Sequence, residues 1–294
     1  MNVSRRDFLK YCGAAAATMG LSGADLFNLK EALANPLGPK VIWIVGAACS
    51  GCSVSLLNRI STTAPTNVAD LLINSIDLVY HPTIMAASGD TAVGALMDAY
   101  NAGGYVLVVE GGIPTAFGGA MCLPYSIDGQ PVTFLQMVRE FSAKAAAVVC
   151  IGQCSAYGGV PAAKPNPARM MGVRAVTGVT TINIAGCPPH PDWICWAIVQ
   201  LLTGAAVPLD SSGRPKALYS QKIHEVCPRR EIDEVETYGV DNACLEELGC
   251  RGPSTYSSCV SSRWNNAQNW CIDANSPCIG CTQPTFPGTS SFYK

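Results

Sequence analysis

The chain has 294 residues and a formal net charge of −2, with 49% apolar and 14% charged residues. This length accommodates one large domain or two smaller ones, and the charge does not favour a nucleic-acid-binding protein. Because soluble domains typically carry about 25% charged residues and monomers rarely expose broad apolar surfaces, we expect an extensive interface with another subunit.

Residues 1–34 have the features of an export signal. Arg5 and Arg6 lie in "SRRDFLK", an alanine-rich stretch follows, and "ALA" at 32–34 fits a small-x-small cleavage pattern. The arrangement is similar to a twin-arginine signal, which exports proteins already folded. We therefore expect cleavage after Ala34 and a periplasmic mature protein, with an ordinary amphipathic helix as the alternative. Cys12 belongs to this signal, and no later apolar run is long enough to predict a transmembrane anchor.

The next part of the chain, residues 35–205, alternates apolar strand-like runs with helical patterns. The predicted strands are "KVIWIVG" (40–46), "SIDLVYH" (75–81), "YVLVVEG" (105–111), "AAAVVCIG" (145–152) and "TTINIAG" (180–186). The predicted helices cover 54–60, 90–103, 133–144, 167–176 and 192–204. This alternation indicates an α/β fold, a flavodoxin-like doubly wound parallel sheet covered on both faces.

Cysteines follow three of these strands. They are Cys49 and Cys52 after the first, Cys154 after the fourth and Cys187 after the fifth. Because ligands bind beyond the carboxyl ends of such strands, we expect the four thiols to meet at one edge, together with Glu110. Four thiolates satisfy one iron–sulfur cluster or one zinc ion. The first loop lacks G-x-G-x-x-G, so nucleotide binding has little support.

The remaining cysteines and two histidines of this half fit structural roles. Cys150 lies inside a predicted strand and Cys195 inside an apolar helix, and Cys122 has no ligand-like spacing. Free cysteine is among the most buried residue types, so all three are predicted to lie in the core. His81 and His190, each followed by proline, are interpreted as structural.

The last part, residues 206–294, lacks helix or strand periodicity and is organised by cysteine. We expect eight ligands in two groups of four, drawn from His224, Cys227, Cys244, Cys250, Cys259, Cys271, Cys278 and Cys281. Such a segment cannot easily form its own apolar core, so bound metal is expected to fix its structure.

Six motifs in order carry a family resemblance: "CSGC", "GQCSAYGGVPAA", "GCPPHPDW", "IHEVCPRR", "ELGCRGPSTY" and "NWCIDANSPCIGC". From about residue 40 onward the chain resembles the small subunit of NiFe hydrogenases. The resemblance implies three iron–sulfur clusters here and a nickel–iron centre in a partner large subunit. The implied ligands of the proximal 4Fe–4S cluster are Cys49, Cys52, Cys154 and Cys187. Those of the distal 4Fe–4S cluster are His224, Cys227, Cys244 and Cys250, and those of the medial cluster include Cys259, Cys278 and Cys281.

The sequence departs from the common family pattern in ways that point to a subgroup. Cys271 stands near a position usually held by proline, which implies a fourth thiolate and a medial 4Fe–4S cluster in place of 3Fe–4S. Val54 stands where glutamate is usual, and together these are most similar to the NiFeSe subgroup. Gly51 and Gly159 occupy the positions of two extra cysteines in oxygen-tolerant members, so a standard proximal cubane is expected.

The resemblance implies an electron-transfer subunit that is active only with its large subunit. Because membrane-anchored members continue into a transmembrane helix and this sequence ends at "SSFYK", we expect a soluble periplasmic acceptor such as a multihaem cytochrome c. Two alternatives remain: a disulfide-stapled secreted binding protein, and a protein with three structural zinc ions. Closely spaced C-x-x-C pairs argue against the first, and visible absorbance would separate iron from zinc.

Overall fold

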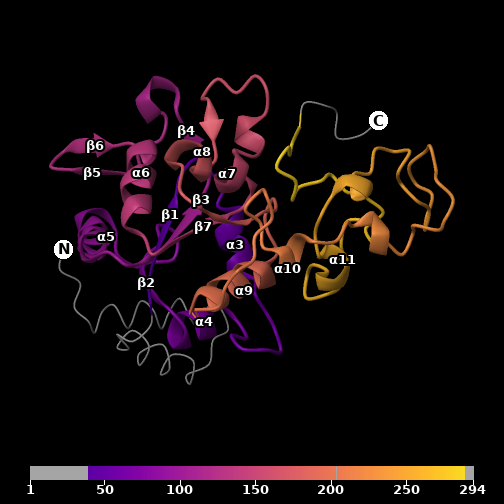
Figure 1. The fold of residues 1–294 in the computed structure, drawn as a ribbon, viewed down its shortest axis with the longest axis horizontal. Helices are drawn as coiled ribbons and strands as arrows, with labels where there is room; N and C mark the ends of the chain where they lie inside the picture. The colour runs from indigo at the N-terminus through magenta and orange to yellow at the C-terminus, as the bar shows by residue number, and fades with distance from the viewer. Residues whose placement is uncertain (1–38, 203, 289–294) are drawn as a thin grey trace.

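A computed structural model describes residues 39–202 and 204–288, in which a five-stranded parallel sheet forms the centre (Figure 1). Its strands, in spatial order, are β2 (Asp77–Tyr80), β1 (Lys40–Val45), β3 (Val106–Glu110), β7 (Ala147–Ile151) and β9 (Ile182–Ile184). All neighbouring pairs run parallel. In chain order this is the 2-1-3-4-5 arrangement of flavodoxin-like sheets, so the predicted α/β fold and its five strands are confirmed.

Helices cover both faces of the sheet because side chains alternate along each strand. Val41 and Trp43 of β1 join one apolar core, and Ile42 and Ile44 join the other. The first core is covered by α3 (Gly51–Leu57), α4 (Val68–Asn74) and α9 (Pro191–Leu202). The second is covered by α5 (Gly89–Ala102), α6 (Phe134–Lys144) and α8 (Val173–Thr177). Figure 1 shows the two helical layers on opposite sides of the sheet.

The helix predicted over 167–176 is wrong in its first half. Met170 and Met171 form strand β8 (Met170–Met171), which pairs antiparallel with β4 (Ile113–Pro114). Helix α8 begins only after Gly172, where an added Cβ would lie 2.2 Å from the carbonyl oxygen of Ala156. This close approach between two backbone segments holds Gly172 extended and separates the two elements.

Short elements complete this half of the chain. The structure adds β5 (Tyr125–Ile127), β6 (Gln130–Val132), α7 (Gln153–Tyr157) and the 3₁₀ turns η1 (Ala116–Gly119) and η2 (Val160–Ala162). Strands β5 and β6 form an antiparallel hairpin. Helix α7 begins immediately after β7, so its first turn lies at the carboxyl edge of the sheet.

The part from residue 206 to 288 has little regular structure, as expected. Its helical turns are α10 (Lys216–Tyr219), η3 (His224–Val226), η4 (Gly252–Ser254) and α11 (Cys259–Ser262). Its buried side chains, including Tyr219, Leu245 and Trp270, belong to the same apolar core as Trp193 and Ile198 of α9. In Figure 1 this orange-to-yellow segment lies beside the sheet, against the side that carries α9.

The predicted signal peptide, with Arg5, Arg6, Cys12 and Ala34, lies outside the described residues. Among the residues that the structure does describe, none belongs to a helix with the length and apolar character needed to cross a membrane.

Candidate metal centres

The structure brings four thiols together at the carboxyl edge of the sheet. Cys49 follows β1, Cys52 lies in α3, Cys154 lies in α7 and Cys187 follows β9. Burial raises the pKa of the Cys52 thiol well above its usual value, and Glu110 and the other three thiols raise it further. Four thiols that oppose each other's ionisation form a site that a positively charged iron cluster would stabilise.

Glycines allow the chain to pass close to these thiols. An added Cβ at Gly152 would lie 2.4 Å from Sγ of Cys52, and one at Gly159 would lie 2.9 Å from the backbone nitrogen of Cys154. Both glycines have positive φ angles, 89° and 56°, which side chains rarely tolerate. No cysteine could replace Gly159 without moving the backbone of Cys154.

A buried carboxylate lies directly behind this site. Glu110 accepts hydrogen bonds from the backbone N–H groups of Cys52 (3.2 Å) and Ser53 (3.3 Å) and from Nε1 of Trp43 (3.0 Å). The Ser53 hydroxyl donates to its second oxygen. The carboxylate thus orients the loop that carries Cys52 and adds negative charge next to that thiol.

His81 supports this network and has the structural role predicted for it. Its Nδ1 accepts the backbone N–H groups of Thr83 (3.1 Å) and Ile84 (3.3 Å), so Nε2 carries the ring proton and donates to the Ser53 hydroxyl, 3.2 Å away. Burial lowers the pKa of His81 to about 4. The ring is therefore neutral and fully buried.

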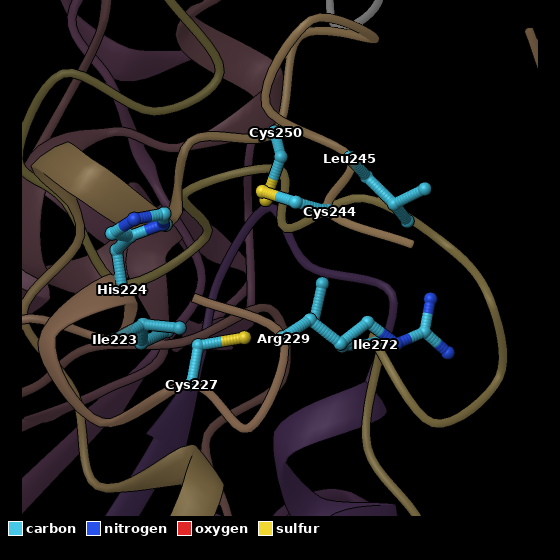
Figure 2. Close-up of a pocket in the computed structure, with 9 residues that line it drawn as sticks. Ile223, His224, Cys227, Arg229, Cys244, Leu245, Cys250 and Ile272 are labelled. Carbon is cyan, nitrogen blue, oxygen red and sulfur yellow. The ribbon is translucent and has the colours of Figure 1, made fainter. Parts of the chain in front are cut away.

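The second group of predicted ligands surrounds a cavity. His224, Cys227, Cys244 and Cys250 all line it, together with Ile223, Arg229, Leu245, Gly252 and Ile272. Figure 2 shows the imidazole and the three thiols arranged around this hollow. His224 and Cys227 come from η3 and the residue after it, whereas Cys244 and Cys250 bracket a separate loop. Soft sulfur ligands and one imidazole suit an iron–sulfur cluster or zinc.

The third group lies between the other two. Cys259 begins α11 and is buried, as is Cys278, and burial raises the pKa of the Cys259 thiol to about 11. Burial raises the pKa values of Cys259, Cys278 and Cys281 most, and the thiol of Cys271 adds a smaller rise to each. Cys271 therefore lies near all three predicted partners, although it is the exposed member of the group.

Neighbouring residues connect the three groups in order. The backbone of Cys187 lies close enough to the thiol of Cys281 to lower its pKa, against the larger opposite effect of burial, which places the first group beside the third. The backbone N–H of Cys278 donates to Sγ of Cys250 at 3.3 Å, which joins the third group to the second. The third group is thus central, and the amino-acid sequence carries no local signal for either contact.

The two alternative interpretations of the cysteines fit the structure poorly. All 14 cysteines of the described residues are free thiols, so disulfide staples are not observed there. A zinc ion with bonds of about 2.3 Å holds its sulfurs about 3.8 Å apart. Within the described ranges, three or more possible ligand atoms lie within 4.8 Å of one another only in the group of His224, Cys244 and Glu246. The sulfur groups are therefore spaced for something larger than one ion.

Two of the other three cysteines lie in the core as predicted, and the third packs against its edge. Cys150 in β7 and Cys195 in α9 are buried, and Cys122 is half-buried against the second core. Burial raises the pKa of the Cys150 thiol above its usual range. These thiols are protonated and apolar in character at neutral pH.

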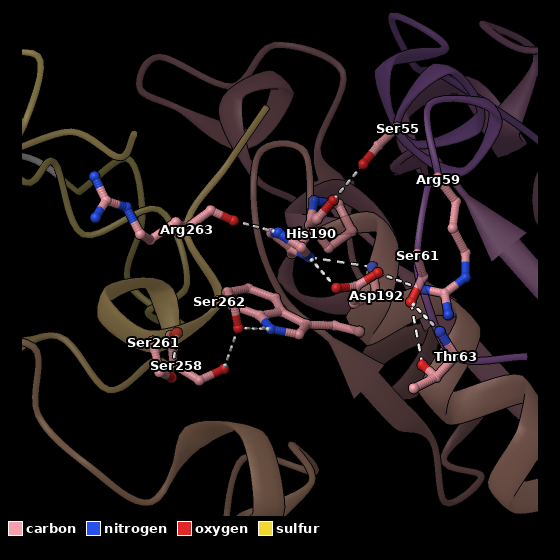
Figure 3. Close-up of polar contacts among 12 residues, drawn as sticks. Ser55, Arg59, Ser61, Thr63, His190, Asp192, Ser258, Ser261, Ser262 and Arg263 are labelled. Atoms are coloured by element: carbon pink, nitrogen blue, oxygen red, sulfur yellow. Dashed lines mark hydrogen bonds and ion pairs between the residues drawn. The ribbon is translucent and has the colours of Figure 1, made fainter. Parts of the chain in front are cut away.

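His190 joins the sheet domain to the C-terminal segment, as Figure 3 shows. Its Nδ1 accepts the backbone N–H of Asp192 (3.1 Å), and its Nε2 lies 2.5 Å from the carbonyl oxygen of Arg263. Arg263 directly follows α11, so this bond helps to hold the helix that begins with Cys259. The structural role predicted for His190 is consistent with these contacts.

Comparison with known protein families finds two matched regions of the chain. Residues 49–201 match a family described as "NADH ubiquinone oxidoreductase, 20 Kd subunit". Residues 219–294 match the family described as the C-terminal part of the NiFe/NiFeSe hydrogenase small subunit.

Similar proteins match along almost the whole sequence. The periplasmic [NiFe] hydrogenase small subunit of Solidesulfovibrio fructosivorans is 41% identical, covering 99% of this chain and 93% of its own. The chain belongs to the NiFe/NiFeSe hydrogenase small-subunit family. The periplasmic [NiFeSe] hydrogenase small subunit of Desulfomicrobium baculatum is 39% identical, covering 100% and 99%.

Solved structures agree with this assignment. A [NiFeSe] hydrogenase structure from Desulfovibrio vulgaris Hildenborough superposes on this small subunit with a TM-score of 0.83 at 35% identity, over 89% of this chain and 99% of that one. A structure of the Desulfomicrobium baculatum [NiFeSe]-hydrogenase gives 0.80 at 38% identity, over 87% and 98%. The small-subunit fold therefore extends through both the sheet and the C-terminal segment.

Proposed function

We propose that this hydrogenase small subunit relays electrons between the nickel–iron centre of a large subunit and an external acceptor, through three 4Fe–4S clusters. The observation that carries the proposal is the order of the three ligand groups, in which the N–H of Cys278 donates to Sγ of Cys250 and the backbone of Cys187 lies beside the thiol of Cys281. Clusters bound there would supply one-electron redox steps.

The ligand groups in this proposal are those predicted from the sequence. The proximal group is Cys49, Cys52, Cys154 and Cys187. The medial group is Cys259, Cys271, Cys278 and Cys281. The distal group is His224, Cys227, Cys244 and Cys250. The chain's own residues hold the clusters, exclude water from the medial group through the burial of Cys259 and Cys278, and adjust charge and hydrogen bonding around the thiolates.

The large subunit is proposed to cover the proximal edge. Cys49 and Cys187 are exposed there, and apolar side chains nearby are also exposed, including Val54 at 50% and Val160 at 49%. Broad apolar exposure of this kind marks protein–protein interfaces. We infer that the large subunit is of the NiFe/NiFeSe type, with Cys271 and Val54 favouring the NiFeSe subgroup.

The external acceptor is proposed to approach the distal group with a positively charged surface. Between residues 225 and 247 eight side chains are Asp or Glu and two are Arg, although the whole chain has a net charge of only −2. Most of these acidic side chains are exposed. Charge complementarity of this kind accelerates the encounter with a basic redox protein, such as a multihaem cytochrome c.

We further propose that residues 1–34 direct export of the folded protein by the twin-arginine route to the periplasm, with cleavage after Ala34. N-terminal sequencing of the exported protein tests this, and a mature chain that begins after residue 34 is the expected result. A mature chain that keeps Arg5 and Arg6 would contradict it.

The electron-transfer proposal is tested on the purified heterodimer. We expect iron equivalent to three 4Fe–4S clusters in addition to the nickel–iron site, broad visible absorbance, and hydrogen-dependent reduction of a basic multihaem cytochrome c that weakens as ionic strength rises. The small subunit alone should not reduce a dye with hydrogen. A colourless or zinc-containing small subunit would overturn the proposal.

A further inference from the structure

Cys259 of the medial group is buried, and polar side chains lie beside its sulfur. The hydroxyl Oγ of Ser257 lies 3.0 Å from Sγ of Cys259, and the indole of Trp264 lies close enough to lower the pKa of this thiol. Ser257 is buried, at 2% exposure. Both groups are neutral, and the indole can only donate.

The direction of the Ser257 contact follows from its second hydrogen bond. The backbone N–H of Cys259 donates to the same Ser257 oxygen at 3.3 Å, so that oxygen already acts as an acceptor. A thiolate bound to iron has no proton to offer, so the hydroxyl must donate to Sγ. The nearby hydroxyl of Thr255 donates to the carbonyl oxygen of Arg251 at 2.5 Å and lies near Cys278, whose pKa it lowers.

The proximal group has a buried carboxylate beside one of its thiols. There the carboxylate of Glu110 accepts the N–H groups of Cys52 and Ser53 and adds negative charge beside the thiol. Negative charge makes reduction less favourable, whereas donors to a ligating sulfur stabilise the added electron. The surroundings therefore favour an electron on the medial group over the proximal group.

We propose that Ser257 and Trp264 are positioning residues that raise the reduction potential of the medial cluster through hydrogen bonds to Cys259. This rests on the proposed function, which places a cluster at that group. A fourth thiolate from Cys271 adds negative charge and lowers the potential of the cluster. The two donors offset part of that effect and keep electron transfer from the proximal group favourable.

The test is a potentiometric titration of the holoenzyme heterodimer followed by electron paramagnetic resonance. Ser257→Ala and Trp264→Phe should each shift one of the three cluster midpoints to lower potential, and the double variant should shift it further. Ser257→Thr keeps the hydroxyl and should restore a midpoint near that of the unsubstituted protein. Ser261→Ala is the matched control. Ser261 lies in α11 with Cys259, and its hydroxyl donates to the carbonyl oxygen of Ser258, so this substitution should shift none of the three midpoint potentials.

Iron content is measured in parallel. If Ser257→Ala loses iron, Trp264→Phe decides, because it removes the indole N–H while an aromatic ring remains beside His190 and Trp193. Unchanged midpoints in variants that keep all their iron would overturn this inference and leave the proposed function standing. Absence of a third cluster in the unsubstituted protein would instead overturn the proposed function.

Discussion

The backbone of Cys278 hydrogen-bonds both Cys250 and the residue that follows it. Its N–H donates to Sγ of Cys250 at 3.3 Å, and its carbonyl oxygen accepts the N–H of Arg251, the next residue, at 2.7 Å. The two residues belong to different ligand groups and are far apart in the sequence. Their peptide groups therefore form a short, doubly bonded bridge between the medial and distal groups, and a shift in one group is transmitted to the other.

Replacing Cys271 with proline should convert the medial centre from 4Fe–4S to 3Fe–4S. The thiol of Cys271 lies near the other three members of its group, and its removal would leave the fourth iron without a protein ligand. We expect the loss of one iron per heterodimer and a new 3Fe–4S signal by electron paramagnetic resonance in the oxidised state. A stoichiometric 3Fe–4S signal in undamaged, unsubstituted protein would show that Cys271 is not a ligand.

Replacing His224 with cysteine should slow electron exit without impairing hydrogen activation. The imidazole of His224 lines the distal cavity, and a thiolate in its place adds negative charge, which lowers the potential of the distal cluster. Reduction of the external acceptor should slow several-fold, while hydrogen–deuterium exchange at the nickel–iron site persists. Equal loss of both activities would indicate that His224 serves folding instead.

Replacing Glu110 with glutamine should raise the potential of the proximal cluster and reduce stability. The substitution removes the negative charge beside Cys52, and its amide nitrogen cannot accept hydrogen bonds from Trp43 and Ser53. A buried donor left without an acceptor costs about 1–3 kcal/mol. Thermal unfolding and potentiometric titration measure the two effects. The prediction fails if the proximal midpoint stays fixed while stability falls.

His81 should make the protein less stable as the pH falls below neutrality. Its pKa is about 4 in the folded state and about 6.5 when unfolded, so below pH 6.5 only the unfolded state takes up the proton. The loss should reach about 1.4 kcal/mol by pH 5.5. The His190 ring, whose pKa burial also lowers, acts in the same direction.

Urea unfolding at pH 7.5 and 5.5 measures this effect, with His81→Asn as the comparison. The asparagine keeps an acceptor for the N–H of Thr83 but does not titrate, so the variant should be less stable overall and depend less on pH. If the free energy of unfolding changed between pH 7.5 and 5.5 by the same amount in the variant as in the unsubstituted protein, the role assigned to His81 would be contradicted.

The sheet could be predicted from sequence because its determinants are local. When helical patterns alternate with apolar β-branched runs such as 40–46 and 105–111, the stable arrangement is a parallel sheet covered by helices on both faces. The short helix α4 was missed because its signal is a single cap, in which the side chain of Asn67 accepts the N–H of Asp70 at 2.9 Å. The helix predicted over 167–176 was half wrong because Gly172 packs closely against the backbone of Ala156. The residues around Gly172 in the sequence do not reveal this contact.

The ligand groups were only partly predictable for a related reason. Cys49, Cys52, Cys154 and Cys187 follow strands, so sheet topology alone places them at one edge. In the C-terminal segment, spacing identified the ligands, and the division into groups came from the family resemblance. The two side chains beside Cys259 are close in sequence, since Ser257 precedes it by two residues and Trp264 follows it by five, but spacing alone does not show that they face its sulfur.

The apolar core shared by α9 and the C-terminal segment restricts how this protein can be recombined. The two matched regions end at residue 201 and begin at residue 219, which suggests a convenient junction for chimeras between relatives. Yet Trp193 and Ile198 pack in one core with Leu245 and Trp270. A chimera that exchanges only the segment after residue 206 would mismatch these surfaces, so the exchanged piece should begin before α9.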